Sequence, residues 1–207
     1  MKNKGLIITT LIFFLIVNTN YFWEAKLGVL AFPAFIFLAL VFIILSFLLL
    51  RQLIIGVKEK FTNKSRVVAI GIMTIILILT FIKPNGLINF DKFNGTDLLI
   101  AQREGAANCM TTIKLKENMT FRERSVCFGV TEIKGTYELR NDTIFFKNIE
   151  YGRNENEFYE FAVIKPSKIN ADKFDFVRFK NRNDTIGNEL WIVKNELKGL
   201  KTKKPNL

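Results

Sequence analysis

Three long apolar runs without charged residues fill most of the first 83 positions, ahead of a more polar second half. They cover Gly5 to Trp23, Leu27 to Leu50 and Val67 to Ile82. The middle run has 24 residues, and a membrane-spanning helix needs about 20 predominantly apolar residues. The third run has 16 residues, so its ends must lie close to the membrane interfaces. The pattern predicts three transmembrane helices within residues 1–84.

The first run has an alternative interpretation as a cleaved signal peptide, because Lys2 and Lys4 precede an apolar core of suitable length. No small residues follow at the spacing that a signal peptidase requires. The run ends instead in Tyr21, Phe22 and Trp23, residue types that settle at a membrane interface. The pattern therefore favours a retained helix, and its removal would leave the orientation of the other two helices unchanged.

Positive charges are unevenly distributed between the loops that join these runs. The first loop contributes only Lys26. The second loop holds Arg51, Lys58, Lys60, Lys64 and Arg66. Because short cytoplasmic loops carry an excess of Lys and Arg, the second loop is predicted to be cytoplasmic. The chain after Lys83 then lies outside the cytoplasm, in the periplasm if the membrane is a bacterial inner membrane.

The second half of the chain is typical of an all-β domain. Turn signals at Pro84-Asn85-Gly86 and Asn94-Gly95 mark a linker over residues 85–96. Residues 97–197 then alternate between short runs rich in β-branched and aromatic residues and Asn, Asp or Gly turns. The predicted strands are 98–103, 109–116, 119–133, 135–140, 143–149, 157–164, 174–180 and 185–195. They predict a small antiparallel up-and-down barrel of about eight strands, similar to a lipocalin, with an open sandwich as the alternative.

A hairpin centred on Asn118 brings the two cysteines of the chain together. If residues 109–116 and 119–127 pair about this position, Leu115 faces Phe121 and Cys109 faces Cys127. Directly opposed Cβ atoms lie about 4.5 to 5.5 Å apart, close to what a disulfide requires. We therefore predict a disulfide between Cys109 and Cys127 in an oxidising compartment; the alternative is a pair of buried thiols in a reducing one.

The other face of this hairpin is cationic. It carries Lys114, Lys116, Arg122 and Arg124, with Lys114 directly across from Arg122. Clustered cations of this kind can hold a phosphate, so Lys114, Arg122 and Arg124 are the candidate ligand-binding residues. The alternative is a solvated exterior, because Ile113, Leu115 and Phe121 claim the opposite face for the core.

The formal net charge of +11 does not indicate a nucleic-acid-binding protein. Residues 85–197 contain 17 cations and 17 anions, so the predicted barrel is neutral. The excess lies beside the apolar runs and in a basic tail, residues 198–207, where membrane orientation and attraction to anionic lipid account for it. We expect the lipid bilayer, and neither DNA nor RNA, to be the partner of these charges.

The chain contains no histidine, which excludes His-based acid–base catalysis, Ser-His and Cys-His nucleophile pairs and His-containing zinc sites. Two cysteines are too few for a four-thiolate metal site. With no Walker loop or dinucleotide fingerprint either, we expect neither a catalytic site nor a cofactor nor a metal. The aromatic residues of the second half are expected to fill the barrel core or to line a small ligand pocket.

In architecture, apolar helices from Gly5 to Ile82 followed by a small β-barrel, the chain resembles the transmembrane effectors of bacterial CBASS antiphage systems. The resemblance implies that the barrel binds a cyclic dinucleotide made by a partner synthase. It also implies that the helices form a homo-oligomer and disrupt the inner membrane. It requires a cytoplasmic barrel, whereas the cation distribution puts the barrel outside.

The competing interpretation follows from that predicted orientation and from the cysteine register. It is a lipocalin-like binding or interaction module, anchored in the inner membrane with its barrel on the outer side and stapled by the disulfide. Both interpretations describe a non-enzymatic membrane protein.

Overall fold

The computed structural model describes residues 3–152, 156–167 and 173–197. The chain divides into two compact units. The first, the helical unit, comprises Met1–Glu24 and Val29–Phe90. The second, the barrel unit, comprises Asp91–Leu207 together with Ala25–Gly28. This division agrees with the composition change near residue 84.

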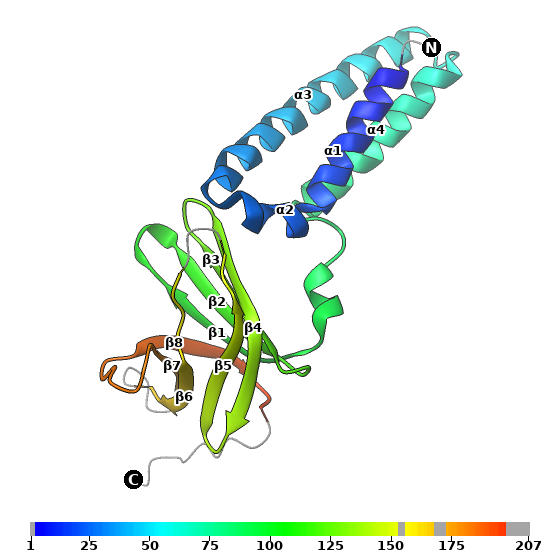
Figure 1. Cartoon of the computed structure of the whole chain (residues 1–207). Coiled ribbons are helices and arrows are strands. Elements are labelled where there is room, and N and C mark those ends of the chain that lie inside the picture. Colours follow the sequence, from blue (N-terminus) through cyan, green and yellow to red (C-terminus); the bar gives the residue numbers. More distant parts are fainter. Residues whose placement is uncertain (1–2, 153–155, 168–172, 198–207) are drawn as a thin grey trace. The chain divides into compact units, whose positions relative to one another are not determined.

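The apolar runs form the helices α1 (Lys4–Asn18), α2 (Asn20–Leu27), α3 (Ala31–Lys58) and α4 (Lys64–Ile82), with a short 3-10 turn, Gly28–Leu30, before α3 (Figure 1). By length and composition, two helical segments could cross a membrane: Asn20–Lys58 and Lys64–Ile82. The first predicted span is shorter than expected, because α1 has only 15 residues.

Polar side chains mark the place where the first apolar run stops being one helix. The side chain of Asn18 donates to the carbonyl of Phe14 and accepts a hydrogen bond from the backbone N–H of Leu87, 2.8 Å away in both cases. Thr19 lies between α1 and α2 and donates its hydroxyl to the carbonyl of Leu15. These residues therefore end α1 before the aromatic residues at 21–23.

The helical unit is apolar both inside and outside. Its buried cluster consists of Phe13, Val17, Leu45, Met73, Ile76 and Leu77. Large apolar side chains also point outward, with Phe37, Phe47 and Phe81 each more than 60% exposed. A helix that is hydrophobic all round is typical of a membrane segment or of the core of a larger assembly.

Eight antiparallel strands close into a barrel in strict chain order, with β8 pairing back onto β1 (Figure 1). The strands are β1 (Asp97–Glu104), β2 (Met110–Lys116), β3 (Thr120–Val126), β4 (Val130–Arg140), β5 (Thr143–Glu150), β6 (Phe161–Pro166), β7 (Phe174–Phe179) and β8 (Asn188–Asn195). Closure leaves no unpaired sheet edge. The predicted up-and-down barrel of eight strands is confirmed, and the open sandwich is wrong.

The predicted register of the β2–β3 hairpin is also confirmed, since Leu115 pairs with Phe121 and Lys114 with Arg122. The predicted boundary between the third and fourth strands is wrong. The turn lies at residues 127–129, whereas the predicted break at residue 134 lies within β4, next to Gly135 and an irregularity of the β4–β5 pairing. A Cβ atom at Gly135 would lie 2.6 Å from the carbonyl oxygen of Lys147 and from the Phe121 ring.

The barrel has two different ends. The end at which β1 starts, here called the base, is joined by the tight turns after β2 and β4. The opposite end, the mouth, carries the connections after β1, β3, β5 and β7. The buried apolar cluster includes Leu99, Leu115, Phe121, Tyr137 and Ile144. The hydroxyl of Tyr137 donates to the backbone carbonyl of Lys116 at 2.8 Å, which satisfies the one polar atom of this large buried ring.

Candidate functional site

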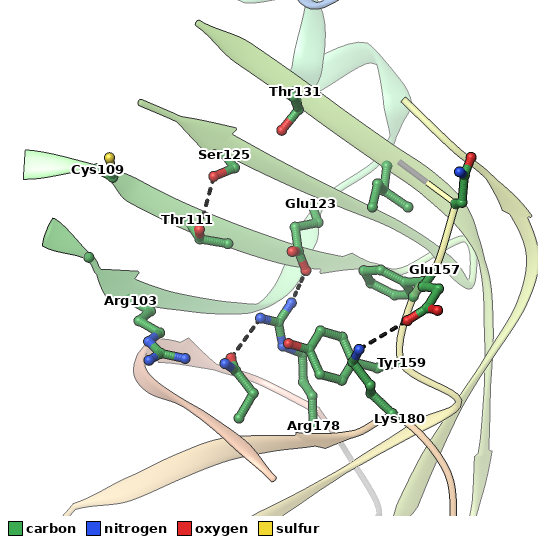
Figure 2. Close-up of a pocket in the computed structure, with 15 residues that line it drawn as sticks. Arg103, Cys109, Thr111, Glu123, Ser125, Thr131, Glu157, Tyr159, Arg178 and Lys180 are labelled. Carbon is green, nitrogen blue, oxygen red and sulfur yellow. Dashed lines mark hydrogen bonds and ion pairs between the residues drawn. The ribbon is translucent and has the colours of Figure 1, made fainter. Parts of the chain in front are cut away.

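A cavity of about 650 Å³ opens at the mouth of the barrel (Figure 2). Its wall combines strand residues with residues of the β5–β6 and β7–β8 connections. The lining residues are Arg103, Gly105, Cys109, Thr111, Glu123, Ser125, Thr131, Ile133, Asn156, Glu157, Phe158, Tyr159, Arg178, Lys180 and Asn188. Most of them are polar, although the inside of a small barrel is ordinarily filled with apolar side chains.

The change from apolar to polar occurs along single strand faces. On β3 the inward positions are Phe121, Glu123 and Ser125, and only Phe121 belongs to the apolar core. On β2 the inward side chain Ile113 is followed toward the mouth by Thr111. The hydroxyls of Thr111 and Ser125 lie 3.1 Å apart and share a hydrogen bond. The interior of the barrel is therefore apolar in the half near the base and polar in the half near the mouth.

Arg178 of β7 is the central charged group of this cavity. Only 3% of the residue is exposed, and its guanidinium forms an ion pair with Glu123 and donates to the side-chain oxygen of Asn188 at 2.8 Å. The guanidinium also lies over the Tyr159 ring, 4.1 Å from its centroid, in a cation–π contact. Its Nε atom has no hydrogen-bond partner among the described residues. A buried ion pair of this kind fixes the geometry of the cavity wall.

The rim of the cavity is formed by the segment Asn156–Glu160 and by Lys180. Lys180 donates to Glu157 at 3.0 Å, and both side chains are exposed (Figure 2). Phe158 turns inward instead and stacks on Phe121 with ring centroids 5.2 Å apart. The predicted strand 157–164 is therefore wrong at its start, because β6 begins only at Phe161. Of the residues before it, Glu157, Phe158 and Tyr159 line the cavity.

Glu123 and Arg178 were not among the predicted site residues, although the hairpin pattern pointed to Glu123. The hairpin register puts Glu123 opposite Ile113, on the core face. A carboxylate on a core face needs a buried partner. Arg178 lies two residues after Phe176 on β7 and therefore on the same inward face, so an inward arginine follows once that strand is placed. The sequence does not show that Glu123 and Arg178, which are 55 positions apart, pair with each other.

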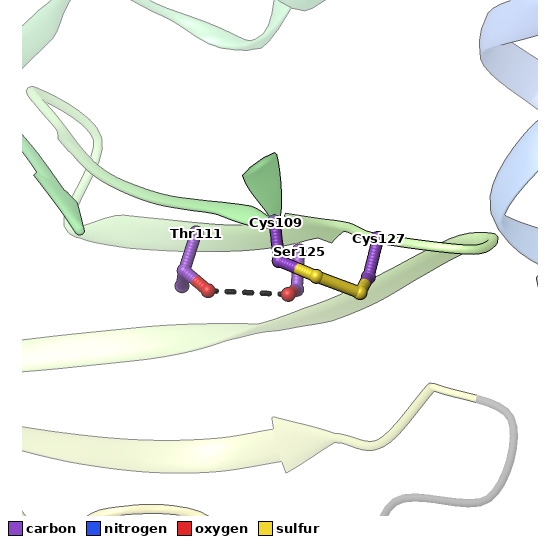
Figure 3. The surroundings of a disulfide bond; sticks show 4 residues. All are labelled: Cys109, Thr111, Ser125 and Cys127. Atoms are coloured by element: carbon purple, nitrogen blue, oxygen red, sulfur yellow. Dashed lines mark hydrogen bonds between the residues drawn. A yellow bond between two sulfur atoms is a disulfide. The ribbon is translucent and has the colours of Figure 1, made fainter. Parts of the chain in front are cut away.

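A disulfide joins Cys109 and Cys127, whose Cα atoms lie 4.3 Å apart (Figure 3). The bridge expected from the register is thus present. It lies next to the hydrogen-bonded pair Thr111 and Ser125, at the mouth end of the β2–β3 hairpin (Figure 3). The bond therefore ties together the two strands that carry Thr111, Glu123 and Ser125 of the polar wall.

The predicted cationic face lies on the outer wall of the barrel and is covered by the chain that precedes β1. We call residues 91–94, which belong to the 3-10 helix Phe90–Asn94, the strap. The carboxylate of Asp91 accepts from Lys114 at 2.5 Å, from Arg122 at 3.0 Å and lies 3.3 Å from the ammonium of Lys116. Lys116 also bonds Asp97 at 2.8 Å, and Arg122 pairs with Glu132. Carboxylates therefore surround the candidate cations.

The interpretation of this face as a solvated exterior is wrong for its central residues. Lys116 is 2% exposed, and the side chain of Arg122 is 11% exposed. Sequence patterning predicted the side on which these cations lie but not the strap that covers them. In the structure Lys114 and Arg122 bind Asp91, and Arg124 lies on the same wall beside Glu132.

The strap carboxylate is strongly stabilised in its charged form. Burial alone would raise the pKa of Asp91, but the hydrogen bond from Lys114 and the charges of Lys114, Arg122 and Lys116 lower it from 3.8 to about 2. Burial tends to lower the pKa of Lys114, yet its bond to Asp91 raises that pKa above the ordinary value. Burial lowers the pKa of Arg124, although the charge of Glu132 acts in the opposite direction.

Comparison with known proteins assigns no family. No protein-family model, no curated protein and no solved structure gave a significant match to the chain. Within residues 3–152, 156–167 and 173–197, no cluster of three or more Cys, Asp or Glu side chains has a geometry that could hold a metal ion. The mouth cavity and the cationic face under the strap are therefore the two candidate sites.

Proposed function

We propose that this protein is a non-enzymatic binding module, anchored in a membrane by its helices, whose barrel takes a small polar ligand in the mouth cavity. The observation that carries the proposal is the polar half of the barrel interior near the mouth. A cavity of about 650 Å³ is within the range of small-molecule sites, and it offers hydroxyl, amide, carboxylate and guanidinium groups in fixed positions. An apolar ligand would leave these groups without hydrogen bonds.

Binding is favoured over catalysis by the state of the charged groups. Glu123 and Glu157, the two carboxylates of the cavity, are both engaged in ion pairs with cations of the same cavity. A general base must have a proton of the substrate within hydrogen-bond reach, whereas these carboxylates are bound to cations of the cavity wall. The absence of histidine from the sequence supports the same conclusion.

The outer side of the membrane is the location that two features support. Five cations lie within residues 51–66, where α3 passes into α4, and only Lys26 lies before α3. This difference favours a cytoplasmic position for the connection between α3 and α4. A disulfide at the mouth fits an oxidising compartment such as the periplasm. We infer an inner-membrane protein with an extracytoplasmic barrel. The orientation is the same for two spans, α3 and α4, as for three.

Calorimetry on the full chain in a neutral detergent tests the cavity, with sugars, amino acids, mononucleotides and cyclic nucleotides as probes. The variant is the double substitution Thr111→Val and Ser125→Ala, because removing both partners of one hydrogen bond changes stability little. Affinity for a ligand of the cavity should fall about tenfold or more, the cost of lost hydrogen bonds. Thr136→Val, on the outer wall, is the control. Unchanged affinity in the double variant, or no heat with any probe, would contradict the proposal.

A second candidate is a cyclic-nucleotide-responsive effector of antiphage signalling whose helices assemble and disrupt the membrane. The cavity contains three cations, Arg103, Arg178 and Lys180, against the two anions Glu123 and Glu157. A net positive cavity beside aromatic rings is suited to a phosphate and a base. This candidate requires a cytoplasmic barrel. A cyclic dinucleotide that binds in the calorimetry, together with a cytoplasmic Leu207, would favour it over the extracytoplasmic module.

A further inference from the structure

The strap is held to the barrel by charge and hydrogen bonds rather than by apolar contacts. Asp91 makes three contacts with cations, and the carbonyl of Asn94 accepts from Asn118 at 3.2 Å. Phe93, the one large apolar side chain of the strap, is 78% exposed, and Lys92 is exposed as well. Releasing the strap at Asp91 therefore exposes little apolar surface. It breaks the ionic contacts of the Asp91 carboxylate, which another anion can replace, and the hydrogen bond from Lys116 to the Asp91 carbonyl.

The cations that hold Asp91 belong to the barrel and stay in place without the strap. Lys114 and Arg122 are paired across the β2–β3 hairpin, and Lys116 ends the same strand β2. Two acidic groups of the barrel unit remain beside them, Asp97 and Glu132. Glu132 is also paired with Lys134, so the cations of this cluster outnumber its remaining carboxylates when Asp91 departs. A buried cation without a counter-charge is unfavourable, so the site favours another anion in place of Asp91.

We propose that this cluster is an exchangeable anion site, in which a phosphate group of a ligand replaces the Asp91 carboxylate against Lys114, Lys116 and Arg122 and so releases the strap. A phosphate suits the site because donors reach both carboxylate oxygens of Asp91 from different sides: Lys114 binds Oδ2, and Arg122 and Lys116 approach Oδ1. A phosphate offers more acceptor oxygens and more charge than the carboxylate it replaces.

The exchange has a mechanical result, because the strap belongs to the connection that follows α4. With Asp91 bound, the barrel wall fixes the chain from residue 91 onward. With Asp91 released, the first position still held to the barrel is Asn94, whose carbonyl accepts from Asn118 at 3.2 Å. The free connection gains residues 91–93, about 10 Å of extended chain. Anion binding under the strap thereby lengthens the free connection between α4 and the barrel. This effect does not depend on which ligand binds in the mouth cavity.

Trypsin cleavage after Lys92 in the full chain reports the release, because a protease needs locally extended chain. In neutral detergent, inorganic phosphate should accelerate this cleavage of the native protein about fivefold or more, with saturation, whereas sodium chloride at equal ionic strength should not. Equal acceleration by both salts would reveal screening alone and overturn the proposal, as would no acceleration. The barrel must stay uncleaved at its own Lys and Arg residues, which controls for unfolding.

The variant Asp91→Asn provides the second measurement. It removes the internal competitor, so cleavage after Lys92 should be fast without any phosphate, and the affinity for inorganic phosphate measured by calorimetry should rise about tenfold or more. Glu138→Gln, which removes an exposed carboxylate paired with Arg140 and Lys147, should change neither quantity. Equal phosphate affinity in Asp91→Asn and the native chain would overturn the proposal.

The same phosphate chemistry occurs in soluble nucleotides and in lipid headgroups, and the membrane composition separates the two sources. In nanodiscs of phosphatidylglycerol without free phosphate, fast cleavage after Lys92 assigns the anion to the lipid. Slow cleavage there, together with acceleration by inorganic phosphate in phosphatidylcholine nanodiscs, assigns it to a soluble ligand. Because these readouts use the strap, they are independent of the test of the mouth cavity.

Discussion

The ammonium of Lys116 lies 3.3 Å from the carboxylate of Asp91 and 2.8 Å from that of Asp97. It also donates to the backbone carbonyls of Asp91 and Gly95, at 3.1 and 3.3 Å. A lysine that is 2% exposed is thus completely surrounded by acceptors. This residue connects the end of strand β2 to the chain that enters the barrel.

Substitution of Lys116 by Met should lower the free energy of unfolding of the barrel by about 3 to 5 kcal/mol, the range found when one partner of a buried ion pair is removed. The loss arises because Asp91 and Asp97 lose the buried cation that lies between them and share only Lys114. Pulse proteolysis with thermolysin across a urea series measures it. Lys92→Met, in the exposed part of the strap, is the matched control and should leave the urea midpoint unchanged.

The stability of the barrel should depend on the charge of Asp91 at acidic pH. The folded-state pKa of about 2 lies below the ordinary value of 3.8, so the contribution is complete above about pH 5 and is lost as the pH falls toward 2. It amounts to about 1 kcal/mol once solvent screening is considered. The difference in unfolding free energy between the native chain and Asp91→Asn should therefore shrink below pH 4. A difference that stays constant from pH 6 to pH 2 would contradict this assignment.

Reduction of the bond between Cys109 and Cys127, which are 18 positions apart, should destabilise the barrel by about 3 kcal/mol in the chain-entropy model. Mass spectrometry of unreduced protein should find the linked peptide pair. The double variant Cys109→Ser and Cys127→Ser should unfold at the same urea concentration with and without reductant. Two alkylatable thiols in protein isolated without reductant would contradict the bond and favour a cytoplasmic barrel.

The side of the membrane can be tested with reporters fused after Leu207. A phosphatase that is active only outside the cytoplasm should be active there, because the cation-rich loop between α3 and α4 is expected inside. Replacing Lys58, Lys60 and Lys64 with Gln should reduce this activity, since those charges set the orientation. Fluorescence from a reporter that folds only in the cytoplasm would instead support the effector candidate.

Gly135→Ala should lower the unfolding free energy of the barrel by about 1 to 3 kcal/mol through overpacking. The new Cβ would lie 2.6 Å from both the Lys147 carbonyl oxygen and the Phe121 ring. Gly105→Ala is the control, because its nearest neighbour, Cys109, lies at an ordinary 3.5 Å. Equal urea midpoints for the two variants would show that the β4–β5 pairing can shift to accommodate a side chain at position 135.

Local patterns predicted the two long apolar helices, the strand number and the β2–β3 register, because each depends on residues close in sequence; the first predicted span is divided into α1 and α2. The hairpin needs only the alternation of Ile113 and Leu115 with Phe121 across a short turn. The contacts missing from the prediction join distant positions. Arg178 and Glu123 are 55 residues apart, and Asp91 and Arg122 are 31 apart. A single sequence shows the charges but not their partners.

Gly135 shows a different limit. The predicted strands 119–133 and 135–140 meet beside it, whereas in the structure β4 continues through it. The backbone of β5 approaches too closely for any side chain at this position. This approach comes from a different strand and cannot be seen in the sequence around residue 135, and the strand boundary lies instead at the turn 127–129.

The position of Phe158 makes the barrel a cup rather than a tube. Its ring stacks on Phe121 and meets Phe146 edge-on, with centroids 5.1 Å apart, so aromatic side chains form a floor beneath the polar wall. A solute that enters from the mouth stops at this floor and leaves by the way it came. Phe158 lies in residues 156–160, which precede β6, rather than in a strand. A change in that segment alone would deepen or fill the cup without disturbing the eight strands around it.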